Sequence, residues 1–124
     1  MVDEGSKPKK REGTTLWLLK IIGGLLIILL LGIHFVINHL VAPGGLLTYQ
    51  DVINYYRTPI VPVMEIFFLV FVVSHSLIGL RSILLDLNPS DYLLKIIDRI
   101  LVIVGSGASI YGALLIIFLA NKGA

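Results

Sequence analysis

The sequence predicts an all-α membrane protein of three transmembrane helices, with its N-terminus in the cytoplasm and its C-terminus outside. Of its 124 residues, 56% are apolar and only 15% are charged, and the mean hydropathy is +0.94. The apolar residues form three blocks, each able to cross a hydrocarbon core of about 30 Å, which takes about 20 helical residues. The Lys and Arg residues gather on one side of these blocks, which sets the orientation.

The first helix is expected over about residues 16–41, because the following Pro43-Gly44-Gly45 does not continue a helix. The second is expected over about 59–85, with Pro59 suited to its first turn. The third is expected over about 90–120, after a break at Asn88-Pro89.

Ser90 is suited to cap the third helix, and Asp91 lies in its first turn. A short interfacial helix is expected within residues 46–57, whose tyrosines suit the headgroup region. The chain therefore divides into a cytoplasmic tail, residues 1–15, and a three-helix anchor domain, residues 16–120. We expect a multi-pass protein of the inner (cytoplasmic) membrane.

The orientation rests on the positive-inside rule. Only Arg57 and Lys122 lie on the side predicted to be outside. The other basic residues lie on the side predicted to be cytoplasmic: Lys7, Lys9, Lys10, Arg11, Lys20, Arg81, Lys95 and Arg99.

Several function classes are excluded by what the sequence lacks. A formal net charge of +2, concentrated near helix ends, does not suggest nucleic acid as a partner. The absence of cysteine excludes disulfides, thiolate metal sites and cysteine nucleophiles. There is no Gly-rich phosphate loop, no His-x-x-x-His zinc pair and no Ser/His/Asp arrangement. The chain is therefore not expected to be catalytic by itself.

His75, flanked by two serines near the middle of the second helix, is the most informative polar residue. A neutral imidazole has one donor and one acceptor nitrogen to satisfy. One arrangement places one nitrogen on a metal, with haem iron as the candidate, and the other on a carbonyl or hydroxyl. Gly79, one turn later, would leave room for the porphyrin. The alternative is a histidine hydrogen-bonded to a neighbouring helix. The residues around His75 do not decide between this alternative and a haem ligand.

His34 in the first helix and His75 are expected to differ in depth by about 15 Å, from a rise of about 1.5 Å per residue. They therefore cannot easily bind the same iron, and each would ligate a different haem whose second ligand comes from another subunit. His39, about 140° round an α-helix from His34, is the alternative ligand, and it otherwise reads as an interfacial residue.

Glu65 lies near the outer end of the second helix and can accept a proton, pair with Arg57 or reach the interface. Arg81 is a candidate for binding a haem propionate, because its fork of donors matches a carboxylate. The third helix carries small residues at close-packing spacings, which predicts tight contact with another helix: Gly105, Ser109, Gly112 and Ala113.

The stretch from His75 to Asp86 resembles the second helix of the small membrane-anchor subunits of succinate dehydrogenase and fumarate reductase. In that family a histidine is followed by Gly at four, often Arg at six and Asp at about eleven, and this chain has Gly79, Arg81 and Asp86 there. The stretch around His34 resembles the corresponding helix of the anchors that hold two haems. The likeness follows all three helices in order and length.

The resemblance implies a haem b-binding anchor subunit of a succinate:quinone oxidoreductase. It implies a second anchor subunit, an iron–sulfur subunit and a flavoprotein as partners, and electron transfer to a quinone in the lipid bilayer. His75 would ligate the haem nearer the iron–sulfur subunit, and His34 a second haem nearer the outer face. Menaquinone is the expected quinone, in which case the membrane potential, worth about 2.3 kcal/mol per charge per 100 mV, would assist uphill transfer.

One position departs from the family. A tyrosine that contributes to the quinone site often follows the aspartate directly, whereas Leu87 follows Asp86 here and Tyr92 comes five residues later. Asp86 is therefore a candidate quinone-site residue, and the position of that site stays open.

Two other functions remain as alternatives at this stage. One is a cofactor-free transport or structural subunit, in which Glu65 couples to protons and the histidines join helices. Against it, Glu65 lies shallow and three helices place the termini on opposite sides. The other is a haem subunit of a different respiratory complex.

Overall fold

The computed structural model describes residues 11–41, 44 and 47–122, and the regular structure within them is helical throughout. In chain order the elements are α1 (Thr14–Phe35), the π-helical segment η1 (Val36–Val41), α2 (Tyr49–Tyr56), α3 (Ile60–Asp86) and α4 (Asp91–Lys122).

Three stretches are long and apolar enough to cross a membrane: Thr14–Val41, Ile60–Asp86 and Asp91–Lys122. This confirms the predicted fold class of an all-α membrane protein with three spans. The last stretch has 32 residues, or about 48 Å of helix at about 1.5 Å per residue, so α4 extends beyond a hydrocarbon core of about 30 Å. The first ten residues of the predicted tail lie outside the described residues.

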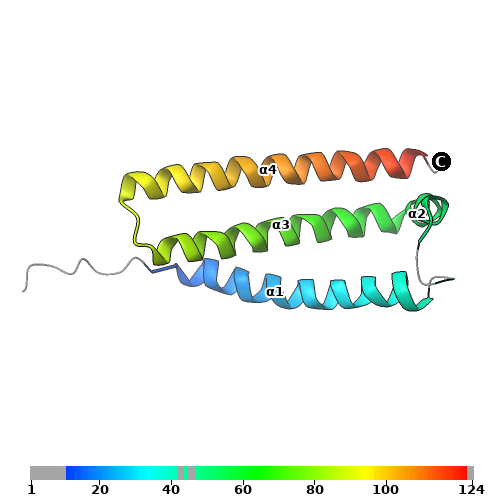
Figure 1. The fold of residues 1–124 in the computed structure, drawn as a ribbon, viewed down its shortest axis with the longest axis horizontal. Coiled ribbons are helices and arrows are strands. Elements are labelled where there is room, and N and C mark those ends of the chain that lie inside the picture. Colours follow the sequence, from blue (N-terminus) through cyan, green and yellow to red (C-terminus); the bar gives the residue numbers. More distant parts are fainter. Residues whose placement is uncertain (1–10, 42–43, 45–46, 123–124) are drawn as a thin grey trace, which may run out of the picture.

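In the view of Figure 1, α3 lies between α1 and α4. α3 contacts both α1 and α4, whereas no described residue of α1 has its Cα atom within 8 Å of one of α4. This arrangement buries few side chains. Among the described hydrophobic residues only Ile53, Val61 and Leu85 are buried. Most of the surface of the three helices is therefore left for lipid or for further helices to cover.

The contact between α3 and α4 is close because α4 presents glycines to leucine side chains of α3. Gly105 is buried, and a Cβ added there would lie 2.5 Å from Cδ1 of Leu77. A Cβ on Gly112 would collide with Leu69 in the same way. The tight contact predicted from the small residues of the third helix is thus confirmed, and α3 is the helix it meets.

The helix ends follow the local chemistry of the sequence. The backbone N–H of Leu93 donates to Oγ of Ser90 at 3.2 Å, so Ser90 caps α4 as predicted. Pro59 precedes α3 as its N-cap instead of lying in its first turn. Between α3 and α4, Asn88 has a φ of 50°, a left-handed conformation that asparagine tolerates better than most residues.

The described part of the predicted interfacial segment forms α2, which contacts α3 and α4. A capping box starts it: the backbone N–H of Asp51 donates to the Thr48 hydroxyl at 3.3 Å, and the Thr48 N–H donates to the Asp51 carboxylate at 2.8 Å. The Thr48 hydroxyl, which donates to the Asp51 carboxylate at 2.7 Å, and then the Thr48 N–H hold the pKa of Asp51 below its usual value of 3.8. Ile53 is buried and anchors α2 on the longer helices.

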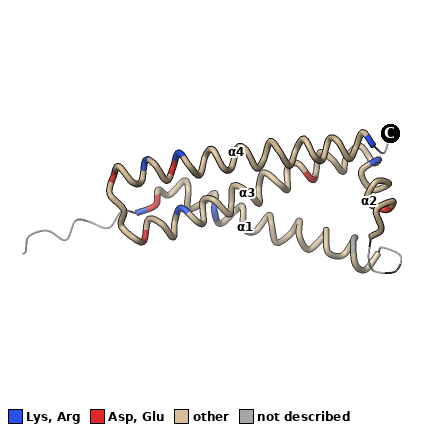
Figure 2. Tube along the Cα trace, turned by 45° about the horizontal axis from the view of Figure 1, so that its top comes forward, with Lys and Arg blue, Asp and Glu red and all other residues tan. Residues whose placement is uncertain are grey.

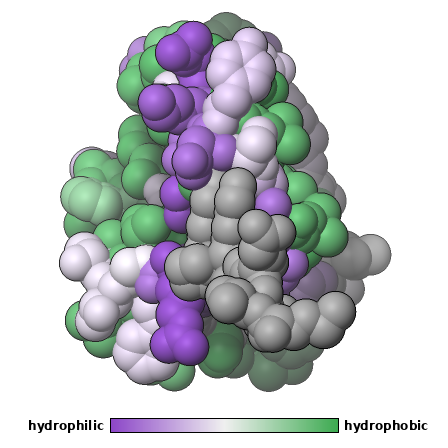
Figure 3. Space-filling model, turned by 90° about the vertical axis from the view of Figure 1, so that its left-hand side faces the viewer, coloured by the Kyte–Doolittle hydropathy of each residue, from purple (hydrophilic) through white to green (hydrophobic). Residues whose placement is uncertain are grey.

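Most of the described charges lie at the end of the molecule that carries the turn between α3 and α4 (Figure 2). Seen from this charge-rich end, hydrophilic side chains form a band between hydrophobic flanks (Figure 3). The described charged residues there are Arg11, Glu12, Lys20, Arg81, Asp86, Asp91, Lys95, Asp98 and Arg99. Which end faces the cytoplasm stays a prediction from this unequal distribution of charge.

Candidate functional site

His75 lies where α3 packs against α1. Its Nδ1 is 3.1 Å from the backbone carbonyl oxygen of Lys20. Because a carbonyl oxygen can only accept, Nδ1 carries the proton and donates it. Nε2 is then the unprotonated nitrogen, whose lone pair is the one that binds metals. This hydrogen bond to a neighbouring helix fits both possibilities inferred from the sequence, the metal ligand with one ring nitrogen on a carbonyl and the histidine that only joins two helices.

Two consecutive glycines of α1 allow this close approach. A Cβ added to Gly23 would lie 3.7 Å from Nδ1 of His75, and one added to Gly24 would lie 3.1 Å from Cε1 of the same ring. A side chain on Gly24 would force the imidazole or α1 to shift. One turn along α3, a Cβ on Gly79 would meet nothing within 4 Å, so the space expected beside the histidine is open.

Lys20 also connects α1 to α3 through its side chain. Its Nζ is 2.7 Å from a carboxylate oxygen of Glu12 and donates to the Ser82 hydroxyl at 3.0 Å. That hydroxyl is 2.7 Å from the other oxygen of Glu12. The hydrogen bonds from Lys20 and Ser82 hold the pKa of Glu12 below its usual 4.5. This network fixes α1 against α3 two turns from His75, at the charge-rich end.

His34 faces a carboxylate instead of a carbonyl. Its Nδ1 lies 3.5 Å from Oε1 of Glu65, and the same oxygen accepts a hydrogen bond of 3.1 Å from the Tyr55 hydroxyl. The imidazole also stacks on Phe68, with ring centroids 6.2 Å apart. The sequence suggested Arg57 as one possible partner of Glu65; among the described residues, the basic side chain within 4 Å of its carboxylate is His34.

Three elements meet at this cluster of His34, Glu65 and Tyr55: α1, α3 and α2 respectively. A small cavity of about 40 Å³ lies beside it. Burial and the negative charge of Glu65 raise the pKa of Tyr55 to about 12, so its hydroxyl stays protonated and donates to Glu65. Tyr56 has a raised pKa for the same reasons.

The contacts fix the relative depth of the two histidines. His75 meets α1 at Lys20, Gly23 and Gly24, whereas His34 meets α3 at Glu65 and Phe68. Between Glu65 and His75, α3 rises by about 15 Å at about 1.5 Å per residue. The two imidazoles are therefore at different heights along the axes of α1 and α3, as the sequence predicts.

His39 lies in η1, where the regular α-helical hydrogen bonding has changed to the wider i→i+5 pattern. This pattern brings residues five apart nearly one above the other, so the α-helical offset of about 140° between His34 and His39 does not hold there. The His39 side chain is exposed, and its ring lies 5.0 Å from that of Phe35 between centroids. π-Helical segments often occur at functional sites.

Arg81 points away from His75, to the other side of α3. Its Nε and Nη2 donate to the two carboxylate oxygens of Asp98 on α4 at 2.6 and 3.1 Å. Three guanidinium N–H groups remain for other acceptors. His75 and Arg81 do not share a face of α3, which does not favour a haem in contact with both. Binding of a propionate by Arg81 stays a prediction.

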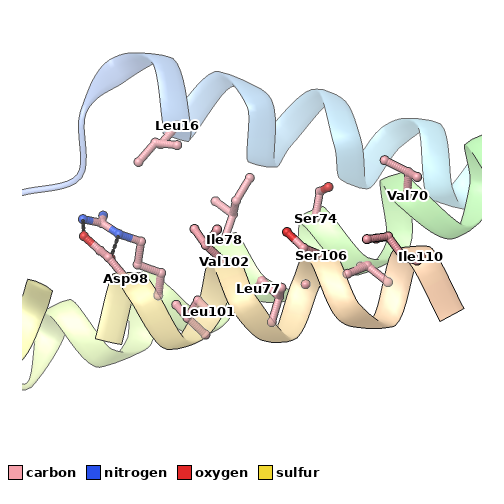
Figure 4. A pocket seen from close by; sticks show the side chains of 14 residues that line it. Leu16, Val70, Ser74, Leu77, Ile78, Asp98, Leu101, Val102, Ser106 and Ile110 are labelled. Atoms are coloured by element: carbon pink, nitrogen blue, oxygen red, sulfur yellow. Dashed lines mark hydrogen bonds and ion pairs between the residues drawn. The ribbon is translucent and has the colours of Figure 1, made fainter. Parts of the chain in front are cut away.

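The Arg81–Asp98 pair closes one end of a groove of about 770 Å³ that is lined by α3, α4 and Leu16 of α1 (Figure 4). Its walls are mainly apolar, with the hydroxyls of Ser74, Ser106 and Ser109 along them. Its volume falls in the usual range of ligand sites, about 300–1,000 Å³. The groove was not predicted from the sequence, although two of its lining residues, Gly105 and Ser109, are among the small residues noted there.

Asp86 ends α3, next to the exposed Leu87. Tyr92, the tyrosine that follows, is 77% exposed in the first turn of α4. All three lie at the turn of the charge-rich end, and the quinone-site assignment of Asp86 stays a prediction.

The described residues form no group of three or more His, Asp or Glu side chains that could hold a metal ion. A haem would need fewer ligands from this chain, because its porphyrin would supply most of the iron ligands and a single histidine could supply another. Each of the two histidines therefore fits the role of a single ligand.

Fold and site together define a multi-pass membrane subunit. Its exposed hydrophobic helices require other helices or lipid to cover them, and it has two partly buried histidines at different depths. A family model described as "Succinate dehydrogenase/Fumarate reductase transmembrane subunit" matches residues 6–120. The chain therefore belongs to the family of transmembrane subunits of succinate dehydrogenase and fumarate reductase. This membership favours the anchor over the transport alternative.

A curated relative supports the same conclusion. The "Succinate dehydrogenase hydrophobic membrane anchor subunit" of Archaeoglobus fulgidus is 38% identical over 72 residues, which are 58% of this chain and 61% of the relative. The match thus spans less than two thirds of the relative's length. No solved structure matches the chain.

Proposed function

We propose that this chain is a haem b-binding anchor subunit of a succinate:quinone oxidoreductase. The observation that carries the proposal is the hydrogen bond from Nδ1 of His75 to the Lys20 carbonyl. It fixes the tautomer and the ring orientation, and it leaves Nε2 as the ligand nitrogen. A bound haem supplies a one-electron redox centre within the membrane.

Several residues around His75 would contribute to binding a haem. The Lys20 carbonyl orients the imidazole, and Gly23 and Gly24 let α1 come close enough for that contact. Gly79 leaves open space beside it. His34 would hold a second haem nearer α2, where Glu65 faces its Nδ1. A partner anchor subunit would supply a further ligand to each haem.

The exposed hydrophobic surfaces of the long helices support the proposed second anchor subunit. Long hydrophobic side chains cover both α1 and α4, including Ile28, Leu29, Val102 and Ile103. A second anchor subunit packs on one face and lipid covers the other. The iron–sulfur and flavoprotein subunits dock on the charge-rich end, where the hydrophilic band lies. Electrons then pass from the iron–sulfur subunit to a quinone, for which we propose menaquinone.

The test is a reduced-minus-oxidised visible spectrum of the purified membrane complex, which should contain low-spin b-type bands. His75→Ala and His34→Ala should each remove one of the two haems. His39→Ala is the matched control and should keep both. A complex without b-type bands would rule out the proposal, and loss of a haem in His39→Ala but not in His34→Ala would move the outer ligand to His39.

A further inference from the structure

We propose that the groove between α3 and α4 binds a phospholipid, with its phosphate at Arg81 and an acyl chain along the apolar walls. The lipid comes from the membrane leaflet at the charge-rich end. This inference concerns the side of α3 that faces away from His75, and it does not depend on haem binding. It rests on the length of the groove, the chemistry of its walls and the hydrogen-bond donors of Arg81.

The groove is about as long as one leaflet of a membrane is thick. Along α3 it extends from Arg81 to Val70, about 16 Å at about 1.5 Å per residue, and along α4 from Asp98 to Ile110, about 18 Å. Half of a hydrocarbon core of about 30 Å is about 15 Å. A transmembrane helix of a partner would cross the whole core, so the length of the groove fits an acyl chain better than a helix.

Arg81 lies at the depth where such a chain begins. α3 has 27 residues, or about 40 Å of helix at about 1.5 Å per residue. When centred, it extends about 5 Å beyond each side of a hydrocarbon core of about 30 Å. Arg81 is about 8 Å from the end of the helix at Asp86. Its backbone is therefore within about 3 Å of the edge of the hydrocarbon, close to the lipid headgroups.

The polar groups that line the groove match this ligand. Asp98 accepts from Nε and Nη2 of Arg81, and the three N–H groups that remain can bind the oxygens of a phosphate. Basic groups between transmembrane helices, near the membrane surface, commonly bind lipid headgroups. The serines deeper in the groove do not require a polar ligand. A serine in a helix can donate to the carbonyl one turn earlier, as Ser76 does to Val72 at 2.8 Å.

The experiment is native mass spectrometry of the membrane complex purified in detergent, which counts the phospholipids that each complex retains. Val102 lines the groove and is 66% exposed, whereas Val104 of the same helix is 53% exposed and does not line it. Val102→Trp should fill the groove, and the complex should then retain one phospholipid fewer per copy of this chain. Val104→Trp is the matched control and should retain the same number as the unmodified complex.

A second variant removes the headgroup contact and leaves the apolar walls unchanged. Arg81→Gln combined with Asp98→Asn replaces the ion pair by two neutral amides, and it should lose the same phospholipid. Arg99→Gln changes an exposed arginine of α4 that does not line the groove, and it should not.

Equal numbers of phospholipids in the unmodified complex and in both groove variants would overturn the inference. Loss of a partner subunit in Val102→Trp, with the phospholipids retained, would overturn it in favour of a partner helix. Loss of a quinone in place of a phospholipid would overturn it in favour of a quinone site.

Discussion

At the scale of single residues, the two histidines were found from the sequence and their partners were not. A histidine in an apolar run is conspicuous because burying its nitrogens is costly. The hydrogen-bond acceptor of His75 is the backbone carbonyl of Lys20. Because every residue has a backbone carbonyl, the sequence does not indicate which one accepts. The contact between His34 and Glu65 had a signal in the sequence, since both are polar groups in the same half of the membrane. Pairing them would have predicted it.

The glycine beside His75 gives a direct test of that site. Gly24→Val should reduce the haem content of the complex, because a Cβ there lies 3.1 Å from the imidazole and the larger side chain displaces the ring from the Lys20 carbonyl. Gly32→Val adds the same atoms to the same helix where nothing lies within 4 Å, and it should leave haem content unchanged. Haem is measured per complex as the pyridine haemochrome. Equal losses in both variants would contradict the role given to Gly24.

The hydroxyl of Tyr55 gives a prediction about pH. The pKa of Tyr55 is raised from 10.0 to about 12, first by burial and then by Glu65. The folded state therefore favours the protonated phenol. The stability from this preference is complete below pH 10 and is lost as pH rises through about 12. The difference in phenolate absorbance between the unmodified chain and Tyr55→Phe should show a step near pH 12. A step near pH 10 would contradict the burial of Tyr55 beside Glu65.

At the scale of the elements, hydrophobic length predicted the helices and local chemistry predicted their ends. Ser90 caps α4, and the break at Asn88 falls between helices as expected, whereas Pro43 lies outside the described residues. The change to a π-helix over Val36–Val41 was not predicted. An apolar run of residues does not indicate whether a helix has α or π hydrogen bonding. The capping box of α2 was present in the sequence as Thr48 and Asp51 and was missed.

Removing this capping box should loosen α2 selectively. Thr48→Ala deletes the side chain that accepts the Asp51 N–H, a change that typically costs about 1 kcal/mol. Hydrogen exchange of the first amides of α2 should then become about fivefold faster. Thr58→Ala is the control, because Thr58 follows α2 and does not cap its start. Similar acceleration in both variants would show that the capping box does not hold the helix.

At the scale of the whole molecule, the number of spans and the uneven charge were readable from the sequence, whereas the order in which the helices contact one another was not. Hydropathy does not distinguish which of three helices contacts both others. Glycines mark the contacts that form: Gly23 and Gly24 of α1 lie against His75 of α3, and Gly105 and Gly112 of α4 lie against leucines of α3. α3 is therefore the helix through which the two outer helices are connected.

The orientation in the membrane can be tested because the chain has no cysteine. Single cysteines at Arg11, Asn88 and Thr58 should react with a membrane-impermeant maleimide from different sides. Reagent added to intact cells should label Thr58→Cys, and reagent added to inverted membrane vesicles should label Arg11→Cys and Asn88→Cys. All three labelling from the same side would contradict the three-span topology, and the reverse pattern would invert the predicted orientation.

The acceptor for His75 has a consequence for mutational scans of this protein. Since the acceptor is the peptide oxygen of residue 20, any of the twenty amino acids at that position still offers it. A scan at position 20 would therefore record only what the ammonium group does for Glu12 and Ser82. Tolerance of substitutions there would hide the contact that orients the histidine, which would become visible only through its glycine neighbours in α1.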